Sequence, residues 1–586
     1  MAKVDLVLLH APSVYDFRES SIMFGPVSDL VPSTPIFEMY PIGFSTMAEY
    51  LERHGFQVRI VNLAVQMLRN PRFNLDKAIA SLHPAVFGID LHWLPHAQGS
   101  IEIARLVKKH HPSTPVVFGG LSSSYFHREL IEYPCVDYVL RGDSCEEPLL
   151  RLMRAIAGRV DFDEVPNLTW KMNDGAIRVN DLTHVPEDIN GLSLNYSYNM
   201  RSVIRYRDMS GAIPFKDWLE YPITAALTCR GCTHSCVTCG GSAFALNNFA
   251  GRKRAAFRDP DILAQDIRQV SKYIPGPIFV LGDISQPGPD YADRLLSQLK
   301  TMRLRNQVAF EFFKPPAEQF FERLEDSLDH YSIEISMESH DEEIRRTFGK
   351  NYTNEALEAS IGYALKHSCE RVDVYFMTGI PKQTADSVRE TGAYCDNLYQ
   401  KMGGDRRMLV FTSPMAPFLD PGSIVWENPE KYGYRLRCRT LEEHRQALLQ
   451  PSWKYIMNYE SEYMSPDEHV EATYQAGIDL NRVKARYGVL DQETAGTTEA
   501  RIQQARKVMS EIDEIMTDDA SKRGVHLANL KHRVDTVNES TVCEKKELVW
   551  PTKLLSPQTL ACAGLWFQHQ LARLIPPKER YDRGEN

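Results

Sequence analysis

The chain has 586 residues, of which 43% are hydrophobic, 25% charged and 10% aromatic, and its formal net charge at pH 7 is −10. That length exceeds what one hydrophobic core supports and indicates about two to four domains. An acidic balance gives no reason to expect a nucleic-acid surface, which is normally basic. No stretch reaches the roughly 20 apolar residues that span a bilayer, so we expect no transmembrane segment. Eleven cysteines without a secretion signal favour reduced thiols in the cytoplasm.

The first 150 residues alternate between β-rich and amphipathic segments. Strands are expected over residues 4–10, 57–64, 85–90, 115–120 and 136–143, and helices over 43–54, 101–111 and 146–158. This alternation predicts an α/β fold with a doubly wound parallel sheet. Ligands of such sheets bind beyond the carboxyl ends of the strands. At or just after those ends stand Asp90, His92, Gly119, Gly120 and Gly142.

A second α/β region follows a short mixed stretch. A hairpin is expected around Asn173-Asp174-Gly175, and then a linker. Six further strands are expected, over 222–228, 277–283, 307–313, 331–339, 371–379 and 407–414. Six such units fit an open, partial version of the (βα)₈ barrel, with active residues at the carboxyl ends of its strands.

From about residue 436 we expect the strands to stop, with helices over 444–450, 467–488 and 498–518. The expected division is a nucleotide-type domain at 1–185, a linker at 186–220, a partial barrel at 221–435 and a helical domain at 436–586. The aromatic-rich segment 451–464 is interpreted as core packing, with a substrate pocket as the alternative.

Residues 228–241 read TCRGCTHSCVTCGG and directly follow a predicted strand. Zinc sites of four thiolates usually separate their two CxxC pairs by about 12–20 residues, whereas these pairs are almost adjacent. Soft sulfur ligands in one compact loop favour an iron–sulfur cluster. Zinc and incidental cysteines remain open alternatives on spacing alone. The interpretation of these cysteines as a disulfide pair is weak, because the sequence shows no secretion signal.

Cys232, Cys236 and Cys239 match the CxxxCxxC signature of radical S-adenosylmethionine (radical SAM) enzymes, and later segments resemble that family in order. Leu281-Gly282-Asp283 resembles its Gly-Gly-Glu element, which receives the amino group of S-adenosylmethionine. Ser336-Met337-Glu338-Ser339 is similar to the segment that touches the ribose, and Gly379-Ile380-Pro381 to the loop near the adenine. Two departures are Thr238, where the family usually has an aromatic residue, and an extra Cys229, interpreted as a buried thiol at a strand end.

The N-terminal region resembles the cobalamin-binding domain of cobalamin-dependent radical SAM enzymes. The resemblance runs from Pro41-Ile42-Gly43 through the strand ends at Asp90, Gly119-Gly120 and Gly142, and with the barrel it covers about residues 1–425. The Asp-x-His-x-x-Gly cobalt-ligand motif of other cobalamin proteins is absent. His92 is a candidate for the lower face of the corrin, and an ordinary hydrogen-bonded histidine is the alternative.

The resemblance implies a [4Fe–4S] cluster held by Cys232, Cys236 and Cys239, together with S-adenosylmethionine and cobalamin. It also implies an electron donor such as ferredoxin or flavodoxin, and methyl transfer to an unactivated carbon of an organic substrate. Radical ring formation or carbon–carbon coupling is the alternative within this chemistry. A non-enzymatic metal- or cofactor-binding sensor is the alternative of another class. Neither the substrate nor a general acid or base can be named. The other cysteines are interpreted as structural: Cys135, Cys145, Cys369, Cys395, Cys438, Cys543 and Cys562.

Overall fold

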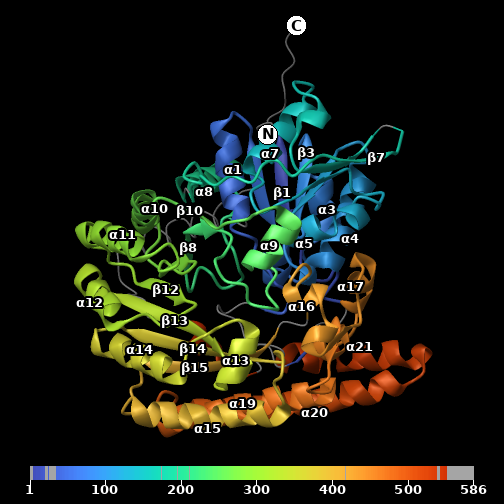
Figure 1. The fold of residues 1–586 in the computed structure, drawn as a ribbon. Helices are drawn as coiled ribbons and strands as arrows, with labels where there is room; N and C mark the ends of the chain where they lie inside the picture. The colour runs from blue at the N-terminus through green and yellow to red at the C-terminus, as the bar shows by residue number, and fades with distance from the viewer. Residues whose placement is uncertain are drawn as a thin grey trace.

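A computed structural model describes residues 4–19, 24–25, 34–172, 174–194, 196–209, 211–415, 418–537 and 542–550. Two parallel sheets dominate the molecule (Figure 1), one built from the N-terminal residues and one from the middle of the chain. The C-terminal helices lie along the side farthest from the N-terminal sheet (Figure 1). Cys562 lies outside the described residues.

The N-terminal sheet has the strand order β2-β1-β3-β4-β5-β6-β7. Its first five strands pair in parallel, as expected. They are β1 (Leu6–His10), β2 (Val58–Asn62), β3 (Val86–Asp90), β4 (Val116–Gly119) and β5 (Tyr138–Leu140). Helices cover both faces, including α1 (Gly43–Arg53), α4 (Ala97–His110) and α7 (Glu146–Ile156). All residues of β1 and β3 are buried, which explains why these strands read as continuous apolar runs.

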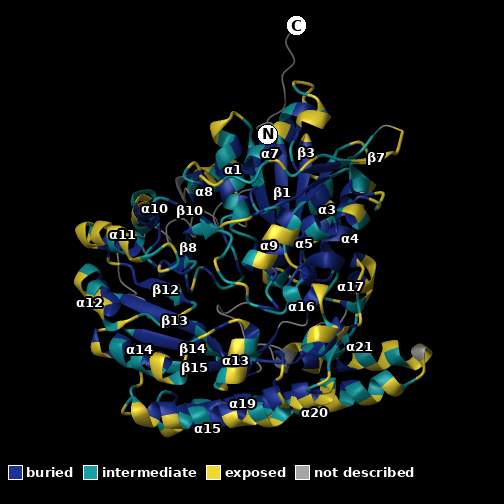
Figure 2. Ribbon diagram, viewed as in Figure 1, coloured by how far each residue is buried: buried dark blue, intermediate teal, exposed yellow. Residues whose placement is uncertain are grey.

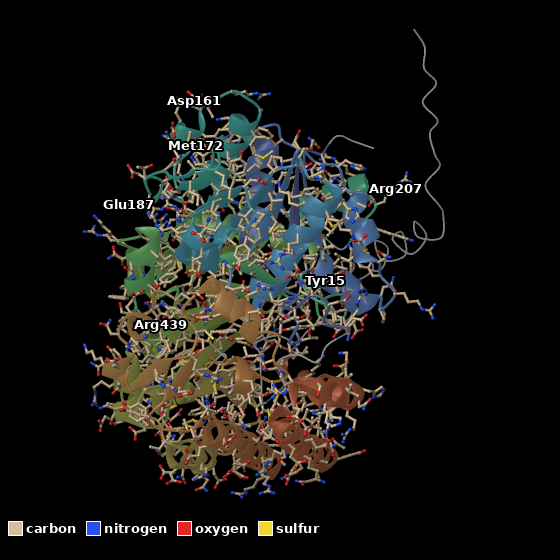
Figure 3. The ribbon with its side chains drawn as sticks, turned by 90° about the vertical axis from the view of Figure 1, so that its right-hand side faces the viewer. Tyr15, Asp161, Met172, Glu187, Arg207 and Arg439 are labelled. Atoms are coloured by element: carbon tan, nitrogen blue, oxygen red, sulfur yellow. The ribbon has the colours of Figure 1, made fainter. Side chains whose placement is uncertain are left out.

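The predicted hairpin is confirmed, and it extends this sheet at one edge. β6 (Leu168–Lys171) pairs antiparallel with both β5 and β7 (Ile177–Val179). Asn173, at the expected turn, lies outside the described residues. Met172 at the end of this hairpin, and the nearby Asp161, lie at the end of the molecule opposite the C-terminal helices (Figure 3).

The second sheet confirms the open six-stranded barrel, because all six strands are parallel in the order β15-β14-β13-β12-β11-β8. They are β8 (Thr224–Leu227), β11 (Ile278–Leu281), β12 (Val308–Phe312), β13 (Tyr331–Glu338), β14 (Arg371–Thr378) and β15 (Met408–Pro414). The helices that connect them include α10 (Pro260–Tyr273), α11 (Pro289–Met302), α12 (Glu318–Ser327), α14 (Asn354–Lys366) and α15 (Ala385–Lys401). The strands are largely buried, whereas the outward faces of the helices are exposed (Figure 2).

The segment expected as a linker contains a helix, α8 (Tyr196–Tyr206). The expected end of the strands at about residue 436 is wrong, because β17 (Tyr459–Ser461) pairs antiparallel with β16 (Tyr434–Leu436). Strands of three residues are too short to show the period of two by which a strand is recognised in a sequence. The segment around β17 packs in the core as expected, with Trp453 only 1% exposed.

The C-terminal helices are α19 (Pro466–Arg486), α20 (Gln492–Thr517) and α21 (Ala520–Val537). α19 packs against α15 and β15. Beyond α21, residues 542–550 form a segment that lies against β14 and β15. Its Cys543 and Leu548 pack on Phe411, and Lys484 of α19 forms a buried ion pair with Glu547. Arg371 of β14 donates to the Val549 carbonyl at 2.8 Å.

This segment lies against the inner face of the open barrel. Strand register places Phe279, Ala309, Ser332 and Arg371 in one row across four strands, so their side chains share one face of the sheet. Trp550 reaches that face: its ring stacks on Phe279 with centroids 5.3 Å apart. The C-terminal segment therefore covers part of the inner face of the open barrel.

Candidate functional site

A cavity of about 680 Å³ lies between the two parallel sheets. The six N-terminal residues predicted as cofactor-binding all line it, namely Gly43, Asp90, His92, Gly119, Gly120 and Gly142. Its second side is formed by Cys229, Arg230 and Gly231 at the start of the cysteine loop, by inward-facing residues of β8 and β11, and by Trp550. The carboxyl end of the N-terminal sheet therefore faces the cysteine loop across one space.

Glycines shape the N-terminal side of this cavity. A Cβ atom added to Gly119 would meet no atom within 4 Å, so hydrogen here leaves room for a ligand against the backbone. Gly120 has φ +120°, and an added Cβ would lie 2.6 Å from the Cα of His92. This edge is a cradle that larger side chains would narrow or distort, which fits the binding of a large planar group such as a corrin.

Three histidines, His10, His92 and His96, cluster with Asp90 at the carboxyl ends of β1 and β3. Nδ1 of His10 lies 3.0 Å from Oδ1 of Asp90, and Nε2 of His10 lies 3.0 Å from the Phe37 carbonyl. Burial lowers the pKa of His10, but the Asp90 charge and hydrogen bond outweigh burial and raise it overall. Burial lowers the pKa of His92 to about 4 and of His96 to about 4, so both imidazoles are neutral. His92 lines the cavity, whereas His96 does not.

The cysteine loop runs from β9 (Cys229–Arg230) to α9 (Ala243–Ala250) and is shaped by short local bonds. The amide of Cys239 donates to the Cys236 carbonyl at 3.2 Å, and the amide of His234 donates to Sγ of Cys232 at 3.3 Å. Gln286, beyond β11, accepts from the Thr233 amide at 2.9 Å. These bonds hold Cys232, Cys236 and Cys239 on one compact turn next to the second sheet.

The chemistry of the three thiols fits a metal cluster. All are free and only partly exposed. Burial raises the pKa of Cys232 and Cys239, and it raises the pKa of Cys236 to about 11. A buried thiolate needs a nearby cation, and a soft metal centre supplies both the charge and the bond. Their assignment as iron ligands remains a prediction. Cys229, expected as a buried thiol, is instead half-buried and lines the cavity.

Gly282 and Asp283 lie directly beside the cysteine loop. Gly282 has φ +92°, and an added Cβ would lie 2.4 Å from Oγ1 of Thr228 and 3.1 Å from Sγ of Cys229. The Asp283 carboxylate accepts from the Ser285 amide at 2.8 Å and from the Phe313 amide at 3.0 Å. Its hydrogen bonds thus shape the loops after β11 and β12.

Ser336 and Glu338 stand at a β-bulge near the carboxyl end of β13, where Glu338 has φ +67°. The Nζ of Lys350 donates to the Ser336 carbonyl at 2.5 Å and to Oε1 of Glu338 at 2.7 Å. Burial lowers the pKa of Lys350, but the Glu338 charge outweighs it and raises the pKa overall. Sequence reasoning missed Lys350, which follows the short helix α13 (Glu342–Phe348) in a turn without a recognisable pattern.

Gly379 and Pro381 directly follow β14, and Gly379 lies against α19 of the C-terminal part. The Gly379 carbonyl accepts from the Tyr434 hydroxyl at 2.7 Å, and its amide donates to Gln383 at 2.8 Å. An added Cβ on Gly379 would lie 2.4 Å from the ring of His469 in α19. Pro381 is buried beside it.

Three carboxylates, of which Glu334 and Asp373 are buried, cross the inside of the barrel in one row, and sequence reasoning missed them. Glu311, Glu334 and Asp373 are register partners on β12, β13 and β14. Burial raises the pKa of Glu311 to about 7 and also raises that of Glu334. Asp373 accepts from Nε1 of Trp550 at 2.8 Å. The available signal was an acidic residue inside an apolar strand, as in VAFEF and YSIEISME.

Two family models match this chain, each over one of the two sheets. The B12 binding domain matches residues 31–148, and the Radical SAM superfamily matches residues 227–395. The chain is a radical SAM protein with a B12-binding domain. The expected cofactors, cobalamin, S-adenosylmethionine and a [4Fe–4S] cluster, are thereby confirmed for this B12-binding radical SAM protein.

Two curated relatives are methyltransferases. Cytidylyl-2-hydroxyethylphosphonate methyltransferase of Streptomyces wedmorensis is 23% identical over 317 residues, which are 47% of this chain and 58% of the relative. Hopanoid C-3 methylase of Methylococcus capsulatus is 25% identical over 303 residues, 49% of this chain and 53% of the relative. The match thus spans little more than half the length of each relative.

Solved structures share the fold over most of the chain. The methyltransferase TsrM from Kitasatospora setae, solved with cobalamin and a [4Fe–4S] cluster, has a TM-score of 0.56 at 16% identity and covers 92% of this chain and 99% of its own. The cobalamin-dependent radical enzyme OxsB has a TM-score of 0.54 at 11% identity and covers 98% of this chain and 80% of its own. In the part of the chain that the structure describes, no helix is long and apolar enough to cross a membrane.

The buried His10–Asp90 pair predicts a pH-dependent stability. The raised pKa of His10 means that its stabilisation is complete below its ordinary value of 6.5 and is lost as the pH rises through the folded-state pKa. The lowered pKa of Asp90 means that its part is complete above the ordinary 3.8 and is lost as the pH falls through the folded-state pKa. Asp90→Asn should cost about 3–5 kcal/mol of unfolding free energy between these limits.

Chemical denaturation of the cofactor-free protein at several pH values measures this cost, which should shrink as the pH rises above 6.5. The control is Asp518→Asn, which removes the exposed partner of His526 at 2.7 Å and should change stability by less than about 0.5 kcal/mol. A cost for Asp90→Asn that is constant across the pH range would contradict the assigned protonation.

Proposed function

We propose that this protein is a cobalamin-dependent radical SAM methyltransferase that acts on an unactivated carbon. One observation carries the proposal: a single cavity extends from the glycine cradle of the N-terminal sheet to the start of the cysteine loop and on to the inner face of β11. Methyl transfer by a radical route requires one substrate to lie within reach of both the methyl carrier and the radical source, and a shared cavity allows this. The methyltransferase relatives add support.

In this proposal the residues bind, orient and exclude water, and the cofactors carry the difficult chemistry. When bound, the cluster, S-adenosylmethionine and cobalamin supply an electron, a carbon radical and a methyl group. Cys232, Cys236 and Cys239 hold the cluster. Residues of the barrel that bind the nucleotide are Gly282, Asp283, Ser336, Glu338, Gly379 and Pro381, as the family resemblance implies. The cradle residues Gly43, Gly119, Gly120 and Gly142 would accommodate the corrin, and Asp90 and His92 line the same side of the cavity and would also contact it.

The barrel side of the cavity supports an apolar substrate group. The side chains that line it there are mostly hydrocarbon or aromatic: Trp218, Ile223, Leu227, Phe279, Leu281 and Trp550. Such a wall offers a methylation target few groups that would act as acid or base. A carbon that carries no activating charge suits radical removal of hydrogen. We therefore propose that the methylated part of the substrate is an aromatic or aliphatic hydrocarbon group.

Further parts of the proposal concern partners and location. An electron donor such as ferredoxin or flavodoxin is expected, because the radical step consumes one electron. The thiols around the cavity and the cysteine loop, Cys229, Cys232, Cys236 and Cys239, are free, which supports a reducing compartment such as the cytoplasm. The net charge of −10 supports the absence of a nucleic-acid partner.

Cys236→Ala tests the cluster ligands. The variant should lose the cluster and form no 5′-deoxyadenosine from S-adenosylmethionine, because two remaining thiolates do not hold the cluster. Anaerobic reconstitution followed by iron analysis, absorbance near 400 nm and product chromatography measures both effects. Cys438→Ala removes another partly exposed free thiol and should leave both unchanged. Retained cleavage of S-adenosylmethionine by the Cys236 variant would contradict the assignment of Cys236 as a cluster ligand.

The two products of S-adenosylmethionine test methyl transfer itself. Methyl donation leaves S-adenosylhomocysteine, and radical cleavage leaves 5′-deoxyadenosine. Reconstituted protein with cobalamin and a reductant should form both, and protein prepared without cobalamin should form little S-adenosylhomocysteine. Liquid chromatography with mass spectrometry quantifies them. Formation of 5′-deoxyadenosine alone would favour ring formation or carbon–carbon coupling over methyl transfer.

The proposed apolar substrate site on the barrel side of the cavity is tested with two matched probes, naphthalene and 2-naphthoate. Equilibrium dialysis against the cofactor-loaded protein should show at least tenfold tighter binding of the uncharged probe. Trp550→Ala should weaken naphthalene binding about tenfold, because it removes an aromatic surface worth more than about 1.4 kcal/mol. Ile177→Ala alters an exposed residue of the outlying hairpin and should have no effect. Equal affinities for both probes would refute the substrate class without touching the cluster assignment.

A further inference from the structure

Two ion pairs, one buried and one partly exposed, join the loop after β5 to the residues around the cysteine loop. The first is formed by Arg252 and Asp143, which are 2% and 8% exposed. The Arg252 guanidinium makes a two-pronged contact: Nε donates to Oδ2 of Asp143, and Nη2 donates to Oδ1 at 3.0 Å. Nη2 also donates to Oγ of Ser144 at 3.2 Å, and Nη1 donates to the Pro186 carbonyl at 3.0 Å. This geometry fixes the direction as well as the distance of the contact.

The second pair is formed by Arg230 and Glu146. Nη2 of Arg230 donates to Oε1 of Glu146 at 2.9 Å, and the same oxygen accepts from the Thr46 hydroxyl at 2.7 Å. Thr46 belongs to α1, which begins at the cavity-lining Gly43. Arg230 lies two positions before Cys232, and Glu146 begins α7. The second pair thus ties the first turn of two N-terminal helices to the start of the cysteine loop.

Three of the four paired residues line the cavity, and only Arg252 does not. Asp143 and Glu146 line it together with Gly142, and Arg230 lines it together with Gly231. Gly231 has φ +89°, and an added Cβ would lie 2.7 Å from Cδ of Arg252. The hydrocarbon part of Arg252 therefore lies against the residue that precedes Cys232, while its guanidinium holds the residue that follows Gly142.

We propose that Asp143–Arg252 and Glu146–Arg230, here named the latch, set the spacing between the corrin cradle and the cluster loop and couple the occupancy of the two sites. Removal of one charge leaves its partner buried and unpaired, so the latched arrangement is strongly preferred over an open one. A corrin that orders the loop at Gly142 therefore also orders the loop at Cys232. If bound cobalamin favours the assembled cluster by a given factor, thermodynamic reciprocity requires that the cluster tighten cobalamin binding by that factor.

The test is the affinity for hydroxocobalamin, measured by absorbance titration of protein with and without an assembled cluster. In the unaltered protein the cluster should tighten binding about fivefold or more. In Asp143→Asn this factor should fall close to one. Glu146→Gln is the milder second variant, because its amide oxygen still accepts from Thr46, and its factor should also fall. The latch residues are positioning residues, so affinity is the primary readout rather than turnover.

A distance measurement separates the latch from a merely structural role. With cob(II)alamin and a reduced cluster, pulsed electron paramagnetic resonance should show a narrow cobalt-to-cluster distance distribution that broadens in Asp143→Asn. The control is Glu442→Gln. Glu442 accepts from the hydroxyl of Tyr133 in the N-terminal part, and it touches neither cofactor loop. This variant should keep both the coupling factor and the narrow distribution.

The proposal rests on the cluster assignment of the proposed function, and the two fail differently. If no cluster assembles in the unaltered protein, the proposed function fails. If cluster and cobalamin both bind but Asp143→Asn and Glu146→Gln retain the coupling factor and the narrow distribution, the latch is overturned while the proposed function stands.

Discussion

Two largely parallel sheets in this protein present their carboxyl ends to one cavity, and the other features follow from that constraint. Loops at the carboxyl end of a parallel sheet are where ligands bind, because the connecting helices cover both faces. Here the glycine loops at Gly119 and Gly142 face the cysteine loop that begins at Cys229. A substrate in this cavity is therefore within reach of both sides, and neither sheet alone would provide the site.

Charged side chains that become buried around this cavity are paired. Asp143–Arg252 and Glu146–Arg230 join the two sides of the cavity, and Glu338–Lys350 lies within the barrel, with each pair largely shielded from solvent. Single buried charges are costly, whereas hydrogen-bonded pairs are tolerated and specify one arrangement in some proteins. The same reasoning applies to the C-terminal segment, whose Glu547 meets Lys484 inside the open side of the barrel.

Agreement between sequence and structure is best where the pattern is local. β1 and β3 are buried on both faces, so each reads as an unbroken apolar run, and each lies where the pattern indicated. The three candidate cluster cysteines were recognisable because their spacing is confined to one loop. β16 and β17 were missed because three residues show no periodicity. Lys350 and Arg252 were missed because nothing near them in the chain indicates Glu338 or Asp143 as a partner.

By itself, the sequence determined the alternating α/β pattern, the compact cysteine loop and the glycines at the strand ends, and with them the two domain types. These features depend on neighbours within a few residues, where backbone geometry and burial leave a regular trace. Only the tertiary structure decided that Trp550 packs on the inner face of the barrel, that three carboxylates align across β12, β13 and β14, and that paired charges join the two sheets. Such contacts join residues up to hundreds of positions apart, and the folded chain alone brings them within hydrogen-bonding distance.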